Sequence, residues 1–135
     1  CLCSRLSLYL YHWQFPCICK GKQPFAEHPI KQQSVMLKHV VMWKFKPFAQ
    51  GKSRMENALW MKENLEGLIG VVPQIKSLQV GINQKESEMA YDAVLILEVE
   101  NFEQLALYKN HPAHQRISTY CKSVRESRTV VDFEE

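Results

Sequence analysis

The side chains best suited to chemistry in residues 36–135 are three histidines and a tyrosine. Tyr108, His111 and His114 lie close together in the sequence, whereas His39 stands alone in an apolar stretch. An imidazole exchanges a proton near neutral pH, and a phenol can donate to a developing enolate oxygen. The combination is typical of proton transfer next to a carbonyl group. We therefore take Tyr108, His111, His114 and His39 as the candidate catalytic and ligand-binding residues.

Metal and thiol chemistry have weaker support. The three histidines show no recognised metal-ligand spacing, and the pairs Cys1-x-Cys3 and Cys17-x-Cys19 are closer than the usual spacing of about two to four residues. Only ordinary helix-surface charges accompany Cys121, which we expect to be a buried or half-buried thiol. We predict no metal site and no cofactor.

His39 is placed by a strand that runs from Met36 to Lys46. A strand turns successive side chains to opposite faces, so residues of one parity share a face. The parity of His39 also contains the large apolar residues Leu37, Val41, Trp43 and Phe45. We expect this face to lie beneath the helices, with Trp43, and Ala93 from a later strand, lining a pocket beside His39.

The remaining segments predict an α+β fold. Ser53 and Glu56 form a capping box for a helix that Gly70 ends, and Asn101 caps a short helix that His111-Pro112 breaks. The order is strand, helix, strand, strand, helix pair, strand, which is the ferredoxin-like split β-α-β arrangement: a four-stranded antiparallel sheet with helices on one face. The predicted elements are strands 36–46, 75–82, 91–99 and 128–133 and helices 54–69, 102–110 and 112–124. The predicted apolar positions of the first helix are Met55, Ala58, Leu59, Leu65, Leu68 and Ile69.

The other face of the sheet is also apolar. It is predicted to carry Val40, Met42, Val94, Ile96 and Val130. Left bare, such a patch would approach several hundred Å², roughly the upper limit for a monomer. A second copy of the sheet is the simplest cover, so we expect a homodimer in which two sheets close into an α/β barrel. The alternative is a monomer with a partly wet sheet.

The charge of the chain is unevenly distributed. The 135 residues carry a formal net charge of +3, but residues 36–135 hold thirteen basic and thirteen acidic residues. A neutral domain gives no electrostatic footprint for nucleic acid or anionic membrane, and no apolar run is long enough to span a bilayer. A single cysteine in this part suits a reducing compartment, so we predict a cytoplasmic protein without nucleic-acid or membrane partners.

Residues 1–35 differ from the rest in composition. They hold four of the five cysteines, three prolines and no sustained periodicity. We expect a leader outside the fold, either disordered or upstream sequence read in frame with Met36 as the natural start. The domain is then predicted to comprise residues 36–135.

Five motifs of residues 36–135 occur together in this chain. They are residues 36–46, Val80-Gly81-Ile82-Asn83, Tyr91-Asp92, Tyr108-Lys109-Asn110-His111-Pro112-Ala113-His114 and Val130-Val131-Asp132-Phe133. Together these motifs resemble the stress-responsive α/β-barrel (Dabb) family. The resemblance implies a dimeric α+β barrel and agrees with the apolar-patch argument. Members include plant stress-induced proteins of unclear activity and a plant polyketide cyclase.

The resemblance to the cyclase also implies residue roles. It implies acid–base roles for Tyr108 and His114 and matches the histidine of the first strand to His39. The chain departs from the cyclase where Ala93 and Leu65 replace a pocket histidine and a pocket tyrosine. Three hypotheses stay open: a stress-associated dimer that binds a small organic ligand, a cofactor-independent enzyme resembling a polyketide cyclase or lyase, and a structural dimer with a filled interior.

Overall fold

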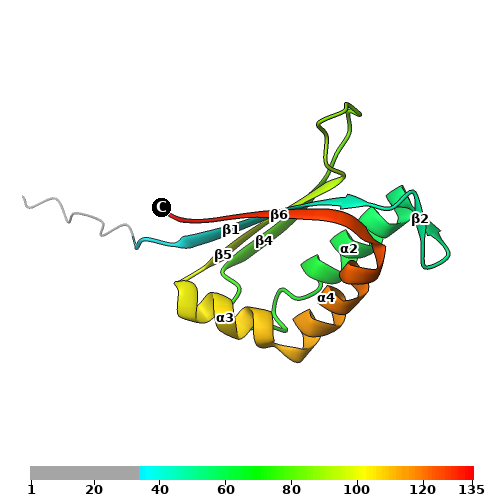
Figure 1. Ribbon diagram of the computed structural model, residues 1–135. Coiled ribbons are helices and arrows are strands. Elements are labelled where there is room, and N and C mark those ends of the chain that lie inside the picture. The colour runs from blue at the N-terminus through cyan, green and yellow to red at the C-terminus, as the bar shows by residue number, and fades with distance from the viewer. Residues whose placement is uncertain (1–33) are drawn as a thin grey trace, which may run out of the picture. The chain divides into compact units, whose positions relative to one another are not determined.

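The computed structural model describes residues 34–135, and its three helices all lie on one side of a four-stranded antiparallel sheet (Figure 1). The strand order is β4-β5-β1-β6, so the sheet is open, with β4 and β6 at its edges. The predicted ferredoxin-like α+β fold is confirmed. The elements are β1 (Leu37–Phe45), β2 (Phe48–Ala49), β3 (Lys52–Ser53), α2 (Arg54–Glu66), β4 (Ser77–Ile82), β5 (Ala93–Val99), α3 (Phe102–Asn110), α4 (Pro112–Val124) and β6 (Arg125–Glu134).

β1 is the central strand and pairs with both β5 and β6. Its two-residue alternation is confirmed, because Leu37, Val41 and Phe45 are buried on the helix side. His39 belongs to the same row and is only 2% exposed. The large apolar residues of the row form the core with α2 and α4, so the imidazole lies among buried apolar side chains.

The register of β6 corrects one prediction. Val130 pairs with Val41 and therefore lies on the helix side, whereas Val131 pairs with Val40 on the opposite face. The assignment of Val130 to the outer face was wrong. Because side chains alternate along a strand, this one-residue error reverses the predicted direction of every side chain of β6.

Helix α2 begins at the predicted capping box but ends early. The Ser53 hydroxyl accepts from the Glu56 N–H, and the Glu56 carboxylate accepts from the Ser53 N–H at 2.7 Å. The helix ends at Glu66, not Ile69, because the Leu68 and Ile69 N–H groups donate to carbonyls three residues back instead of four. Gly70 does adopt the left-handed conformation, with φ of +82°, but in the turn beyond the helix.

The buried face of α2 also differs from the predicted one. Ala58, Leu65 and Leu68 are buried as expected, but Met55, Leu59 and Ile69 are exposed. The true buried stripe runs through Asn57, Met61 and Leu65, which are spaced four residues apart. Because Asn57 at the start of this stripe is polar, the hydropathy pattern does not identify the stripe.

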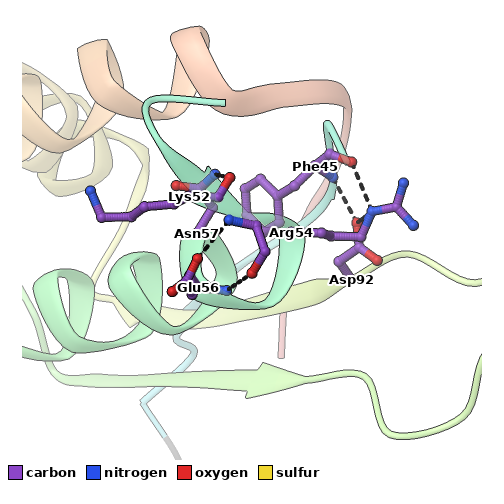
Figure 2. A network of polar contacts seen from close by, with 7 residues as sticks. Phe45, Lys52, Arg54, Glu56, Asn57 and Asp92 are labelled. Carbon is purple, nitrogen blue, oxygen red and sulfur yellow. Dashed lines mark hydrogen bonds and ion pairs between the residues drawn. The ribbon is translucent and has the colours of Figure 1, made fainter. Parts of the chain in front are cut away.

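Asn57 joins α2 to the β2–β3 hairpin and to α4. Its amide nitrogen donates to the Ala49 and Lys52 carbonyls, and its amide oxygen accepts from the Tyr120 hydroxyl at 2.7 Å. Figure 2 shows this amide beneath the hairpin and, beyond it, the Asp92 carboxylate that accepts from the Phe45 N–H. The contacts of Asn57 thus join α2 to the hairpin and to α4.

The edge of β4 is held by α2. The Lys62 ammonium donates to the Val80 carbonyl at 2.7 Å, and the Val80 N–H donates to Glu66. Charged side chains of α2 thus hydrogen-bond the backbone groups of β4 that an exposed edge strand would offer to another chain.

The predicted leader, residues 1–35, falls almost wholly outside the described residues. Within residues 34–135, no helix combines the length and apolar character needed to cross a membrane.

Candidate functional site

A cavity of about 330 Å³ lies between the helix side of the sheet and helices α2 and α4. Its volume is at the lower end of the range of small-molecule sites. The apolar part of its wall consists of Val41, Trp43, Met61, Leu65, Leu95 and Ile117, and two imidazoles, His39 and His114, also line it. The cavity therefore combines an apolar part with two imidazoles and several other polar and charged side chains.

His39 is paired with a carboxylate on the neighbouring strand. Asp132 lies opposite His39 in the β1–β6 register, and its carboxylate contacts Nδ1 of the imidazole. A carboxylate only accepts hydrogen bonds, so Nδ1 carries the proton and Nε2 is the acceptor of the neutral ring. Burial lowers the pKa of His39, while Asp132 opposes that shift. The neutral imidazole with a basic Nε2 is the form present at pH 7.

His114 lies on the first turns of α4. Its Nδ1 donates to the Lys109 carbonyl at 3.1 Å, which again leaves Nε2 as the acceptor. Burial is the main cause that lowers the pKa of His114, and the nearby positive charges of Arg128 and Lys109 add to it. The cavity thus presents two histidines that are neutral at pH 7.

Tyr108 lies behind His114, outside the cavity wall. Its ring packs against the His114 ring with centroids 4.4 Å apart, and the residue is fully buried. Its hydroxyl has no hydrogen-bond partner among the described residues, and burial raises the pKa of the phenol strongly. An unpaired buried hydroxyl is costly, so this group has an unused hydrogen bond next to the ring of His114.

The other predicted ligand-binding residues divide between the cavity and the scaffold. Trp43 lines the cavity. His111 instead caps α4, with its Nδ1 accepting from the Ala113 N–H at 3.1 Å. Ala93 is buried at the start of β5, opposite Trp43, and does not line this cavity. The structure brings His39, Trp43 and His114 together and leaves His111 and Ala93 apart from them.

Sequence reasoning did not identify Asp132 as part of the site. The residue lies within one of the family motifs. However, the prediction that Val130 lies on the outer face also placed Asp132 on that face, away from His39. The signal was the alternation itself, because placing Val131 on the outer face puts Asp132 beneath the helices.

The described residues contain neither an activated thiol nor a cluster of metal ligands. Cys121 is buried on the cavity wall, and burial raises the pKa of its thiol to about 11, which disfavours the nucleophilic thiolate. Within residues 34–135, no three His, Cys, Asp or Glu side chains cluster as a metal site requires.

Comparison with known proteins identifies one family. The family model of the stress responsive A/B barrel domain (Dabb) matches residues 37–135. Sequence comparison with curated proteins gives no match.

Solved structures with the same fold include several dimers. A dimeric protein of unknown function from Bacteroides fragilis is 27% identical, with a TM-score of 0.67, over 74% of this chain and 96% of that one. A dimeric ferredoxin-like protein from Jannaschia is 25% identical, with a TM-score of 0.58, over 74% and 99%. The hydroxynitrile lyase of Passiflora edulis, 10% identical with a TM-score of 0.62 over 74% and 93%, shares the fold.

The first prediction concerns the His39–Asp132 pair. Replacing Asp132→Asn removes the negative charge that raises the pKa of His39 against burial, so the pKa of His39 should fall further below its ordinary value of about 6.5. Imidazole NMR resonances followed against pH measure it. Glu134→Gln, two residues along β6, should leave the His39 titration unchanged, and an unchanged or raised pKa in Asp132→Asn would contradict the pairing.

Proposed function

Because the chain belongs to the stress responsive A/B barrel (Dabb) family, we propose that it forms a homodimer in which each subunit binds a small organic molecule in the cavity beside His39. The observation that carries this proposal is the cavity of about 330 Å³, whose wall combines an apolar part with the imidazoles of His39 and His114 and other polar groups. Its volume supports ligand binding over an interior filled by side chains.

The homodimer is supported by the outer face of the sheet. Met42 and Ile96 are each 39% exposed there, although they lie on the two central strands. The outer face also carries Val40, Val94, Val131 and Phe133. Exposed apolar residues that continue across three paired strands are typical of an interface. The dimeric state of the similar bacterial proteins agrees with this argument.

Acid–base catalysis is the second candidate function, favoured by the His39–Asp132 pair. A carboxylate that holds the Nδ1 proton orients the imidazole and stabilises it when Nε2 takes up a proton. His39 or His114 would remove a proton next to a substrate carbonyl. Tyr108 could donate to the resulting enolate oxygen if the substrate reaches its unpaired hydroxyl.

The homodimer is tested by a charge placed in the outer face. Ile96→Glu should convert the protein to a folded monomer at micromolar concentration, because a buried unpaired carboxylate opposes association. Leu59→Glu is the matched control, since Leu59 is 44% exposed on α2 and should tolerate the change within the dimer. Sedimentation velocity separates the two states. A wild-type monomer would contradict the proposal.

Ligand binding is tested by filling the cavity. Ser118 lines it, so Ser118→Trp should abolish the binding of aromatic and polyketide-like compounds, as measured by thermal shift and titration calorimetry. Thr119→Trp adds the same side chain at the exposed neighbouring position and should bind normally. Equal binding by both variants would place the ligand elsewhere, and a wild-type protein that binds nothing in the panel would favour the structural dimer.

Catalysis is tested by removing one imidazole from the cavity. If the protein is an enzyme, His114→Ala should reduce turnover by about 10²- to 10⁴-fold while the dimer stays intact. His111→Ala removes an imidazole that caps α4, so it should lower stability and leave turnover of the folded protein near wild type. Similar turnover in both variants would exclude His114 as the acid or base.

A further inference from the structure

The wall of the cavity carries four positive charges. Lys109, Lys122, Arg125 and Arg128 line it, and among residues 34–135 no Asp or Glu does. None of these four forms an ion pair with another described residue, because the ion pairs of residues 34–135 involve Lys38, Arg54 and Lys62. Residues 36–135 are neutral overall. The positive charge is therefore concentrated at the cavity.

A β-bulge brings the two arginines to one side of the sheet. Arg125 lies opposite Phe45 and Ser127 opposite Lys44, so Glu126 is an extra residue without a partner in β1. Residues three apart in a regular strand point to opposite faces, whereas one inserted residue turns both arginines to the helix side. Bulges often occur next to active sites, where they redirect side chains.

The charged and apolar parts of the wall are separated in depth. Lys109, Lys122 and Arg128 are exposed and Arg125 is half-buried, so their charges lie at the rim. The floor is apolar and buried, with Trp43 and Leu65 both at most 5% exposed. A ligand with an apolar body and one anionic end would match both regions.

We propose that the cavity selects an apolar organic acid, whose ionised carboxylate binds Arg125 and Arg128 at the rim while its apolar body fills the floor. This inference rests on the proposed ligand-binding function. A guanidinium binds a carboxylate through two parallel hydrogen bonds, and unpaired arginines at a rim are available for this pairing. Lys109 and Lys122 add a field that attracts the anion to the mouth.

A bound anion would also change the two histidines. The positive charges of Lys109 and Arg128 contribute to lowering the pKa of His39 and of His114. A carboxylate at the rim opposes these charges, so the pKa of both imidazoles should rise when an acid binds. A neutral ligand of the same shape lacks this effect.

The experiment compares acids with their uncharged amides. The probes are phenylalkanoates from phenylacetate to phenyloctanoate and the primary amide of each, titrated into the dimer by NMR and calorimetry. For the best-fitting chain length, the acid should bind at least about tenfold more tightly than the amide, and added salt should reduce the difference. The acid, but not the amide, should raise the pKa of His39 and His114.

Substitutions in β6 test whether its two arginines cause the preference for the acid over the amide. Arg128→Gln should remove most of the acid-over-amide preference, and Arg125→Gln serves as a second variant if Arg128→Gln does not fold. Arg116→Gln is the matched control, because Arg116 is exposed on α4 and lies outside this cavity. It should keep the preference.

The outcomes separate this inference from the proposed function. Equal affinities for acid and amide in the wild-type protein would overturn the inference and leave ligand binding intact. Binding of neither series would overturn both. A preference that survives both Arg128→Gln and Arg125→Gln would overturn the assignment of the carboxylate to these arginines.

Discussion

The pairing of β6 with β1 determines which charged groups meet at the cavity. β1 is buried on its helix side, so its register cannot slip without moving Leu37 and Phe45 out of the core. The side chain of each β6 residue therefore points to the same face as that of its partner in β1. Asp132 lies beside His39, and Arg128 lies beside Trp43. A shift of one residue would turn both charges to the outer face.

Burial and pairing act on His39 in opposite directions. Removal from water disfavours the charged imidazole, while the Asp132 carboxylate favours it, and burial is the larger effect on the pKa. In the unfolded chain the pKa returns to about 6.5, so this histidine destabilises the fold as the pH falls below that value. Above that pH His39 is neutral, and Asp132 accepts the hydrogen bond from its Nδ1 proton. Such an imidazole is suited to accept a further proton at Nε2.

The sequence was sufficient to predict the fold but only part of the site. The strict alternation in β1 and β5 identified the helix-covered face because both strands carry large apolar residues on that parity. β6 offered a weaker contrast, since Val130 and Val131 are apolar on both parities and the bulge at Glu126 interrupts the alternation. Asn57 was missed for a related reason, because its burial depends on partners in a hairpin and in α4. These features arise from tertiary contacts, and a local hydropathy pattern does not contain them.

The two faces of β6 connect the proposed interface to the proposed site. β6 is an edge strand, so one of its sides lacks a neighbouring strand within the described chain. Val131 and Phe133 face the outer side, where a second subunit would cover them, and Asp132 lies between them on the helix side. Covering the outer face would therefore restrain the strand that supplies both Asp132 and Arg128. The homodimer would then stabilise the geometry of the cavity.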